Sequence, residues 1–183
     1  MKKIIALLLV LFAFAAPRAE AQKIALRSNA LAWAACGTTN LGLEVALWPR
    51  LTLDVEGFCN PWEFDSHRQS KLWASQGELR LWFCRKFTGH FIGLHGGYAD
   101  YDWGMCKYRY EGWSLGGGLS YGYALPIARR WRLEANLGAG YIHRSYDKSD
   151  RVQYPDDVVM YGRTVSDRFG LTRAGLNVVF LIH

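Results

Sequence analysis

The stretch WRLEANLGAGY, from Trp131 to Tyr141, alternates between two kinds of side chain. Its odd-numbered positions carry Trp, Leu, Ala and Tyr, and its even-numbered positions carry Arg, Glu, Asn and Gly. Side chains of a β-strand point alternately to opposite faces, so this period of two predicts a strand with one apolar and one polar face. The same pattern recurs along most of the chain and decides the fold class.

Eight segments show this alternation. The predicted strands are Ile24–Ala35, Asn40–Trp48, Leu51–Cys59, Leu72–Cys84, Phe91–Trp103, Glu111–Leu125, Arg130–His143 and Gly170–Ile182. Most have the length of about 9–11 residues that a tilted strand needs to cross a bilayer. No helix is predicted after the first 21 residues, because no segment there has a convincing helical period.

Residues 1–21 are predicted to be a cleaved signal peptide. Lys2 and Lys3 precede the apolar run Ile4–Ala16, and Ala19-Glu20-Ala21 has the small-x-small form of a signal-peptidase site. The apolar run is too short for a transmembrane helix. Residues 22–183 are then one domain, and their net charge of +4 is spread without the basic runs that indicate nucleic-acid binding.

The polar faces of the strands predict which side of the sheet is buried. They are rich in glycine, which weakens a solvent-facing strand but suits the narrow interior of an eight-stranded barrel. They also carry charges that nearly cancel, as expected if buried charges must be paired. The predicted lumen charge network comprises Arg27, Glu44, Asp54, Glu56, Glu78, Arg80, Arg132, Glu134 and Arg173. Such a plugged lumen predicts no porin activity.

The connections between the strands alternate in length, as they do in bacterial outer-membrane barrels. The short ones are 48–50, 85–90 and 126–129, and the longer ones are 60–71, 104–110 and 145–169. Only the short connection 36–39 breaks this alternation. The fold class predicted is therefore all-β, an eight-stranded antiparallel up-and-down transmembrane β-barrel in the bacterial outer membrane. The alternative is a soluble, secreted, lipocalin-like binder whose apolar face points inward.

The longest connection, Ser145–Phe169, is the best candidate for contact with a partner, because loops on rigid scaffolds often carry recognition. Its candidate residues are Asp147, Asp150, Arg151, Asp156, Asp157 and Arg163. The predicted topology places Cys36, Cys59 and Cys106 at the external end and Cys84 at the other. At most one intramolecular disulfide is therefore expected, among the external three, and the pairing stays open.

No catalytic, cofactor-binding or metal-ligating residues are predicted. The segment GWSLG, Gly112–Gly116, matches the letters of a nucleophile elbow, but it lies within a strand and not at a strand-to-helix turn. His90, His95 and His143 lie on different strands without metal-ligand spacing. The enzyme alternative is a lipid acyl hydrolase or transferase, which requires Ser114 or Ser66 (beside Asp65 and His67) to contact a histidine.

Several short motifs together resemble a known family. They are NLGLEV (40–45), LTLD (51–54) with NPW (60–62), ELRLWFC (78–84), GHFIG (89–93), RYEGW (109–113) and WRLE (131–134). The chain resembles the uncharacterised barrels of Bacteroides-type bacteria that form the family called domain of unknown function three-five-seven-five. This resemblance implies an outer-membrane β-barrel and supplies no activity. Some members occur in fimbrial gene clusters, which implies a surface or fimbrial partner for the external loops.

Overall fold

The computed structural model describes residues 24–34, 37–61, 63–65, 68–105, 108–151 and 158–182, so the predicted signal peptide lies outside the described residues. The elements are β1 (Ile24–Asn29), α2 (Ala30–Ala34), β2 (Thr39–Trp48), β3 (Leu51–Asn60), β4 (Glu63–Asp65), β5 (Arg68–Trp82), β6 (Gly89–Met105), β7 (Tyr108–Pro126), β8 (Trp131–Arg151) and β9 (Val158–Ile182). Within these ranges, no helix is long and apolar enough to cross a membrane.

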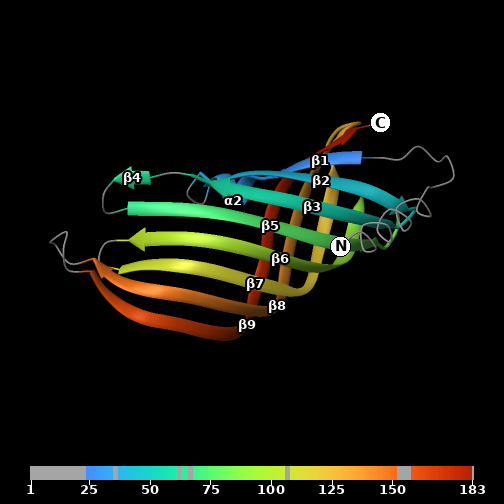
Figure 1. Cartoon of the computed structure of the whole chain (residues 1–183). Coiled ribbons are helices and arrows are strands. Elements are labelled where there is room, and N and C mark those ends of the chain that lie inside the picture. The colour runs from blue at the N-terminus through green and yellow to red at the C-terminus, as the bar shows by residue number, and fades with distance from the viewer. Residues whose placement is uncertain are drawn as a thin grey trace, which may run out of the picture.

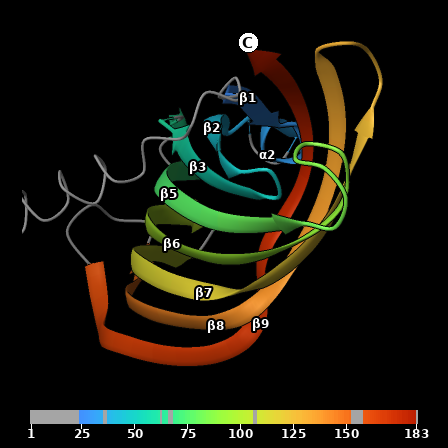
Figure 2. The ribbon, with the colours of Figure 1, turned by 90° about the vertical axis from the view of Figure 1, so that its right-hand side faces the viewer.

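Eight of the strands close into a ring (Figure 1). The hydrogen-bonded order is β3-β2-β1-β9-β8-β7-β6-β5, and pairing of β3 with β5 completes the circle. Every pairing is antiparallel, and Figure 2 shows the C-terminal end of β9 returning beside β1. β4 is a short addition that pairs with β5. The predicted all-β, eight-stranded antiparallel up-and-down barrel is therefore confirmed.

The register of the strands defines how steeply they tilt. A path of paired residues around the ring starts at Arg27 and runs through Gly42, Glu56, Gln76, Gly97, Gly116 and Ile142 to Arg168. Arg27 itself pairs with Val179, which lies eleven residues beyond Arg168 (179 minus 168). One of these eleven is Thr172, the extra residue of a bulge in β9. The shear of ten over eight strands corresponds to a tilt of about 40°, and such a barrel has an interior just wide enough for side chains.

Glycine is what allows β7 and β8 to approach within this narrow ring. Gly118 and Gly140 face each other across these strands. A Cβ atom on Gly140 would overlap the carbonyl oxygen of Gly117, and one on Gly118 would overlap that of Ala139. Backbone atoms cannot move aside as a flexible side chain can, so the strands themselves would have to shift.

We therefore expect Gly140→Ala to lower the free energy of unfolding by about 1–3 kcal/mol, the usual cost of overpacking. Urea unfolding of the protein in detergent micelles measures this change. Gly57→Ala is the matched control, because a Cβ atom at this strand position meets nothing within 4 Å. Equal stability of the two variants would contradict the close approach of β7 and β8.

The apolar part of the interior lies at the end with the short turns. Trp82, Phe91 and Ala124 form one buried cluster, and the rings of Trp82 and Phe91 contact each other in a tilted arrangement with centroids 4.7 Å apart. A second cluster comprises Ala25, Ala46, Phe87, Val179 and Leu181. Phe87 lies in the turn between β5 and β6 with a φ of 61°, which is costly for a residue with a Cβ. Burial of its ring holds this turn against the end of the barrel.

The first predicted strand, Ile24–Ala35, is too long. β1 ends at Asn29, and the five-residue helix α2 follows, so the prediction of no helix in this region is wrong. Asn29 caps the helix, because its Oδ1 accepts a hydrogen bond from the backbone N–H of Leu31 (3.0 Å). The same side chain bonds the backbone of Ala174 and Leu176 on β9. The helix is therefore stabilised by its cap and by a tertiary contact. A five-residue helix is too short to show a helical repeat of apolar residues in the sequence.

The long connections are mostly strand, which corrects the predicted loop Ser145–Phe169. β8 continues to Arg151, β9 begins at Val158, and β6 and β7 likewise extend to Met105 and from Tyr108. Both faces of these extensions carry polar residues, so hydrophobic alternation did not reveal them. They project beyond the ring as a curved wall, which comprises residues 68–74, 97–105, 108–116, 142–151 and 158–171 (Figure 1).

The wall has an open edge. β9 pairs with β1 only from Asn177 to Ile182, while its pairing with β8 extends to Val158. Among the described residues, no strand pairs with the other edge of β9 between Val158 and Leu176. β9 is the outermost strand of the wall in both views of the ribbon (Figures 1 and 2).

Candidate functional site

Eight charged side chains lie buried together in the middle of the ring. No one of them is more than 5% exposed. The cations are Arg27 on β1, Arg80 on β5 and Arg173 on β9, and the acids are Glu44 on β2, Asp54 and Glu56 on β3, Glu78 on β5 and Glu134 on β8. They share an inward face because alternate residues of each strand point into the ring. We call these eight residues the charge cluster.

Arg80 is the centre of the charge cluster. Its Nη1 lies 3.0 Å from Glu44 and 3.1 Å from Glu134, and its Nη2 lies 3.2 Å from Asp54. Its Nε lies 2.5 Å from Glu78, two residues away on the same strand. The guanidinium group also lies over the ring of Phe91, 4.7 Å from its centroid. One side chain thus connects four carboxyl groups from four strands to the apolar end of the interior.

Arg27 and Arg173 form the other ion pairs of the charge cluster. Arg27 Nη2 lies 2.5 Å from Glu134, and its Nη1 lies 3.2 Å from Asp54. Arg173 Nη2 lies 2.9 Å from Asp54 and 3.3 Å from Glu56. Since these pairs join strands that are not neighbours in the sheet, the charge cluster cross-links the ring through its interior.

Uncharged polar side chains complete the hydrogen bonding of the charge cluster. Thr52 donates to Glu44 (2.5 Å), Ser120 donates to Glu78, and Asn136 and Asn177 donate to Glu134 (3.0 and 3.1 Å). The predicted lumen charge network contained charged residues only and therefore left these four out. Their position on the same inward face as the charged residues is the signal that could have found them.

The structure brings together eight of the nine predicted lumen charges and leaves out Arg132. The guanidinium group of Arg132 instead donates to the backbone carbonyls of Phe87, Ala128 and Trp131, at the end with the short turns. Its neighbour Trp131 begins β8, so the side chain reaches the turns and not the middle of the ring. Without Arg132, the charge cluster contains three cations and five carboxyl groups, a larger acidic excess than the sequence predicted.

This excess leaves carboxyl oxygens without a hydrogen-bond donor. Oδ1 of Asp54 and Oε1 of Glu56 are buried and accept no hydrogen bond within the described residues. Uncompensated negative charge in a closed interior is costly, so these two carboxyl groups are the least satisfied part of the charge cluster.

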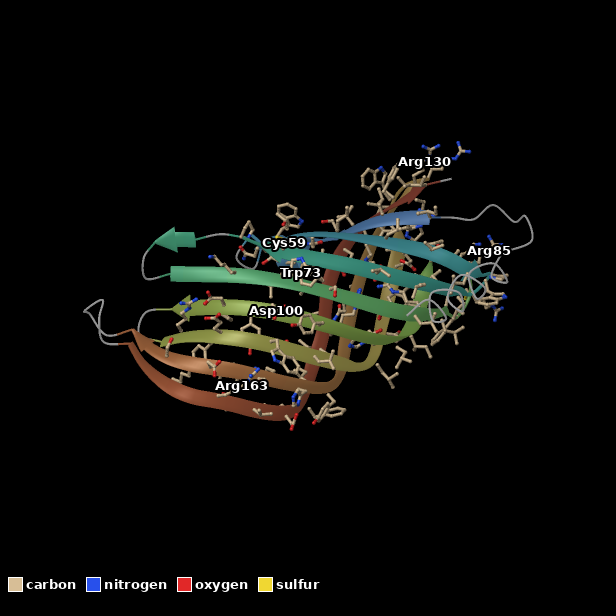
Figure 3. All side chains as sticks on the ribbon, viewed as in Figure 1. Cys59, Trp73, Arg85, Asp100, Arg130 and Arg163 are labelled. Atoms are coloured by element: carbon tan, nitrogen blue, oxygen red, sulfur yellow. The ribbon has the colours of Figure 1, made fainter. Side chains whose placement is uncertain are left out.

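The other predicted sites are placed as follows. Cys59 and Cys84 are free. Cys59 lies at the end of β3 (Figure 3), Cys84 follows the end of β5, and Cys36 and Cys106 lie outside the described residues. Asp147 is exposed on β8, and Arg163 on β9 donates from Nε to Ser145 Oγ (2.7 Å). The side chains of Asp150, Arg151, Asp156 and Asp157 also lie outside what is described.

The three histidines that were considered above as metal ligands have separate hydrogen-bond partners and do not form one site. His90 bonds Tyr121 (2.6 Å), His95 bonds Thr172 (2.7 Å), and His143 bonds Asp167 (2.6 Å). Ser114 lies within β7, and no hydrogen bond in the described part of the chain joins it to a histidine. In that same part, no group of three or more His, Cys, Asp and Glu side chains could hold a metal ion. The side chains of Asp65, Ser66 and His67 lie outside the described set.

The chain matches the model of a known protein family. The model of a family described as "Protein of unknown function (DUF3575)" matches residues 5–182, which is nearly the whole chain. No curated protein and no solved structure matches.

Proposed function

Because the chain belongs to the DUF3575 family, whose function is unknown, we propose its role from the geometry: a non-porin β-barrel of the bacterial outer membrane. The charge cluster plugs the lumen of this barrel. The wall projects from the external side and presents a surface to a partner. We assign no catalytic step to the protein. Its first partner is the lipid bilayer itself.

The observation that carries this proposal is the orientation of the side chains. Leu133, Leu137 and Leu176 point away from the ring and are 37%, 62% and 38% exposed, while Glu134 beside them is buried. The same holds for most large apolar residues of the ring strands, including Leu53, Leu79, Leu94 and Leu119. A continuous apolar exterior of this kind suits hydrocarbon and is a liability in water. A soluble lipocalin-like barrel would have the opposite orientation.

The ends of this apolar exterior support a membrane position. Exposed aromatic side chains surround the end with the short turns and include Trp48, Phe83, Tyr123 and Trp131. A second aromatic group towards the wall includes Trp73, Tyr98, Trp113, Tyr141 and Phe169. Aromatic residues favour the two membrane–water interfaces. The short turns add basic residues that suit anionic headgroups: Arg50, Arg85, Lys86, Arg129 and Arg130. Figure 3 labels two of them, Arg85 and Arg130.

The interior supports the absence of a pore. Eight strands leave a narrow lumen, and in this chain the apolar clusters and the charge cluster occupy it at successive levels. Ions would have to pass the paired guanidinium and carboxyl groups, whose separation is costly.

Reconstitution of the refolded protein tests both parts of the proposal. In lipid vesicles we expect the protein to resist extraction by alkaline carbonate, and in planar bilayers to show no stable channel. Release by carbonate into the soluble fraction would refute the membrane role. Large, long-lived conductance steps would refute the plugged lumen while leaving membrane insertion intact.

A further inference from the structure

The two faces of the wall carry opposite charge. On its convex, outward face lie five acids, Asp100, Asp102, Glu111, Asp147 and Asp167. Three cations lie on the same face: Arg109 binds Asp102 (2.7 Å) and Glu111 (3.2 Å), Arg163 donates to Ser145, and Lys71 lies opposite Asp102 in the pairing of β5 with β6. The hydrogen bond with Asp102 raises the pKa of Arg109. Figure 3 labels Asp100 and Arg163 on β6 and β9.

The concave face carries positive charge. Arg144 and Lys148 on β8 and Arg168 on β9 occupy the positions that continue the inward face of the ring. Among the described side chains of the wall, this face holds no acid. The Nε atom of Arg144 is buried and has no hydrogen-bond partner within the described residues. A buried donor without an acceptor is costly and indicates a group that a ligand can satisfy.

Aromatic side chains lie on the same concave face. Tyr101 on β6 and Tyr146 on β8 flank Gly112 in one row of paired residues, and Trp103 and Tyr110 pair in the next row. Tyr110 and Tyr146 contact edge to face, with ring centroids 5.9 Å apart. Burial raises the pKa of Tyr101, and the positive charge of Arg144 opposes this rise.

The concave face continues into the ring as a cavity of about 170 Å³ above the charge cluster. Its lining includes Phe58, Gln76, Ser114, Ile142 and Thr172. Guanidinium groups bind carboxylates and phosphates in two-pronged fashion, and aromatic rings stack on flat apolar faces while a tyrosine hydroxyl supplies hydrogen bonds. Rings, hydroxyl groups and negative charge occur together in acidic saccharides. The acidic convex face disfavours a long polyanion such as nucleic acid.

We propose that the concave face of the wall binds an acidic saccharide. Arg144 and Arg168 bind its carboxylate or phosphate groups, and Tyr101, Tyr110 and Tyr146 contact its sugar rings. The site rests on the proposed function in one respect, since the wall must face the outside of the membrane for the ligand to reach it.

Calorimetric titration of the refolded protein in detergent micelles tests the site without requiring a bilayer. The probe is hexagalacturonate, compared with neutral maltohexaose, a hexaglutamate peptide and a single-stranded hexanucleotide. We expect hexagalacturonate to bind most tightly, with an affinity that falls as salt is added. Arg144→Met and Arg168→Met are each expected to weaken this binding at least tenfold.

Arg163→Met is the matched control, because Arg163 lies on the same strand as Arg168 but on the opposite face. It should leave the affinity unchanged, and resistance to heat in gel electrophoresis checks that each variant is folded. Absence of hexagalacturonate binding, or equal loss in all three variants, would overturn the site. Equal or tighter binding of the hexanucleotide or the peptide would also overturn the saccharide assignment. Binding in micelles together with failed insertion into vesicles would overturn the membrane role alone.

Discussion

Replacing Arg80 with methionine is expected to prevent the barrel from folding at neutral pH. Arg80 contacts Glu44, Asp54, Glu78 and Glu134 in a fully buried environment. Methionine keeps the unbranched stem of the side chain but has no charge, so the variant leaves five carboxyl groups with two arginines. Removal of one partner from a buried charged group costs about 3–5 kcal/mol, which is a large part of the stability of a small domain.

Heat-dependent migration in gel electrophoresis and urea unfolding in micelles measure the effect of Arg80→Met. Acidic pH should restore folding in part, because protonated carboxyl groups no longer need the missing cation. The control is Arg129→Met in an exposed turn, which is expected to change stability by less than about 0.5 kcal/mol. If Arg80→Met unfolds at the same urea concentration as the unaltered protein at pH 7, Arg80 does not organise the interior.

Replacing Leu94 with arginine is expected to weaken insertion into a bilayer by about 2–4 kcal/mol, the cost of a cation near the middle of a barrel's lipid-facing surface. Leu94 is 61% exposed on β6, and its paired neighbours Leu79 and Leu119 extend the apolar surface on both sides. The interior does not change, so the effect isolates the exterior. Folding titrations into lipid vesicles measure it.

The matched control for Leu94→Arg is Asp100→Arg, on the same strand and the same outward face but in the wall. This residue lies beyond the apolar surface, so its replacement should leave the insertion energy nearly unchanged. A soluble barrel would tolerate arginine at both positions. Indifference of vesicle insertion to Leu94→Arg would therefore argue against the membrane position while leaving the fold intact.

Alternation along the strands was sufficient to predict the ring and the orientation of its faces. Positions such as Leu133 and Glu134 differ in hydropathy because one points outward and the other inward, and this contrast is visible in the sequence. For the same reason eight members of the charge cluster could be named in advance. Arg132 and Glu134 are both even-numbered residues of β8, whose side chains point inward, yet Arg132 lies at the end of the strand. The alternation predicts which face a side chain is on, but not how far along the barrel axis it lies.

The strand ends could not be predicted, because their residues lack that contrast. In the wall, Ser145 and Tyr146 are both polar, although one side chain points outward and the other inward. The concave aromatic face was missed for a related reason. Tyr101, Tyr110 and Tyr146 lie far apart in the sequence, and only the register of β6, β7 and β8 brings them together. The helix α2 depends on contacts of Asn29 with Ala174 and Leu176, nearly 150 residues away.

The unpaired edge of β9 has a consequence for how molecules of this protein meet. No described strand pairs with this edge, and an edge strand can template another strand, so two copies that meet side by side could join their walls into one continuous sheet. Arg163, Asp167 and Arg168 lie along this edge, and their charges limit such joining to arrangements in which opposite signs oppose each other. Crowding of copies, and not the chemistry of any single one, would then determine whether the proteins remain separate or form rows.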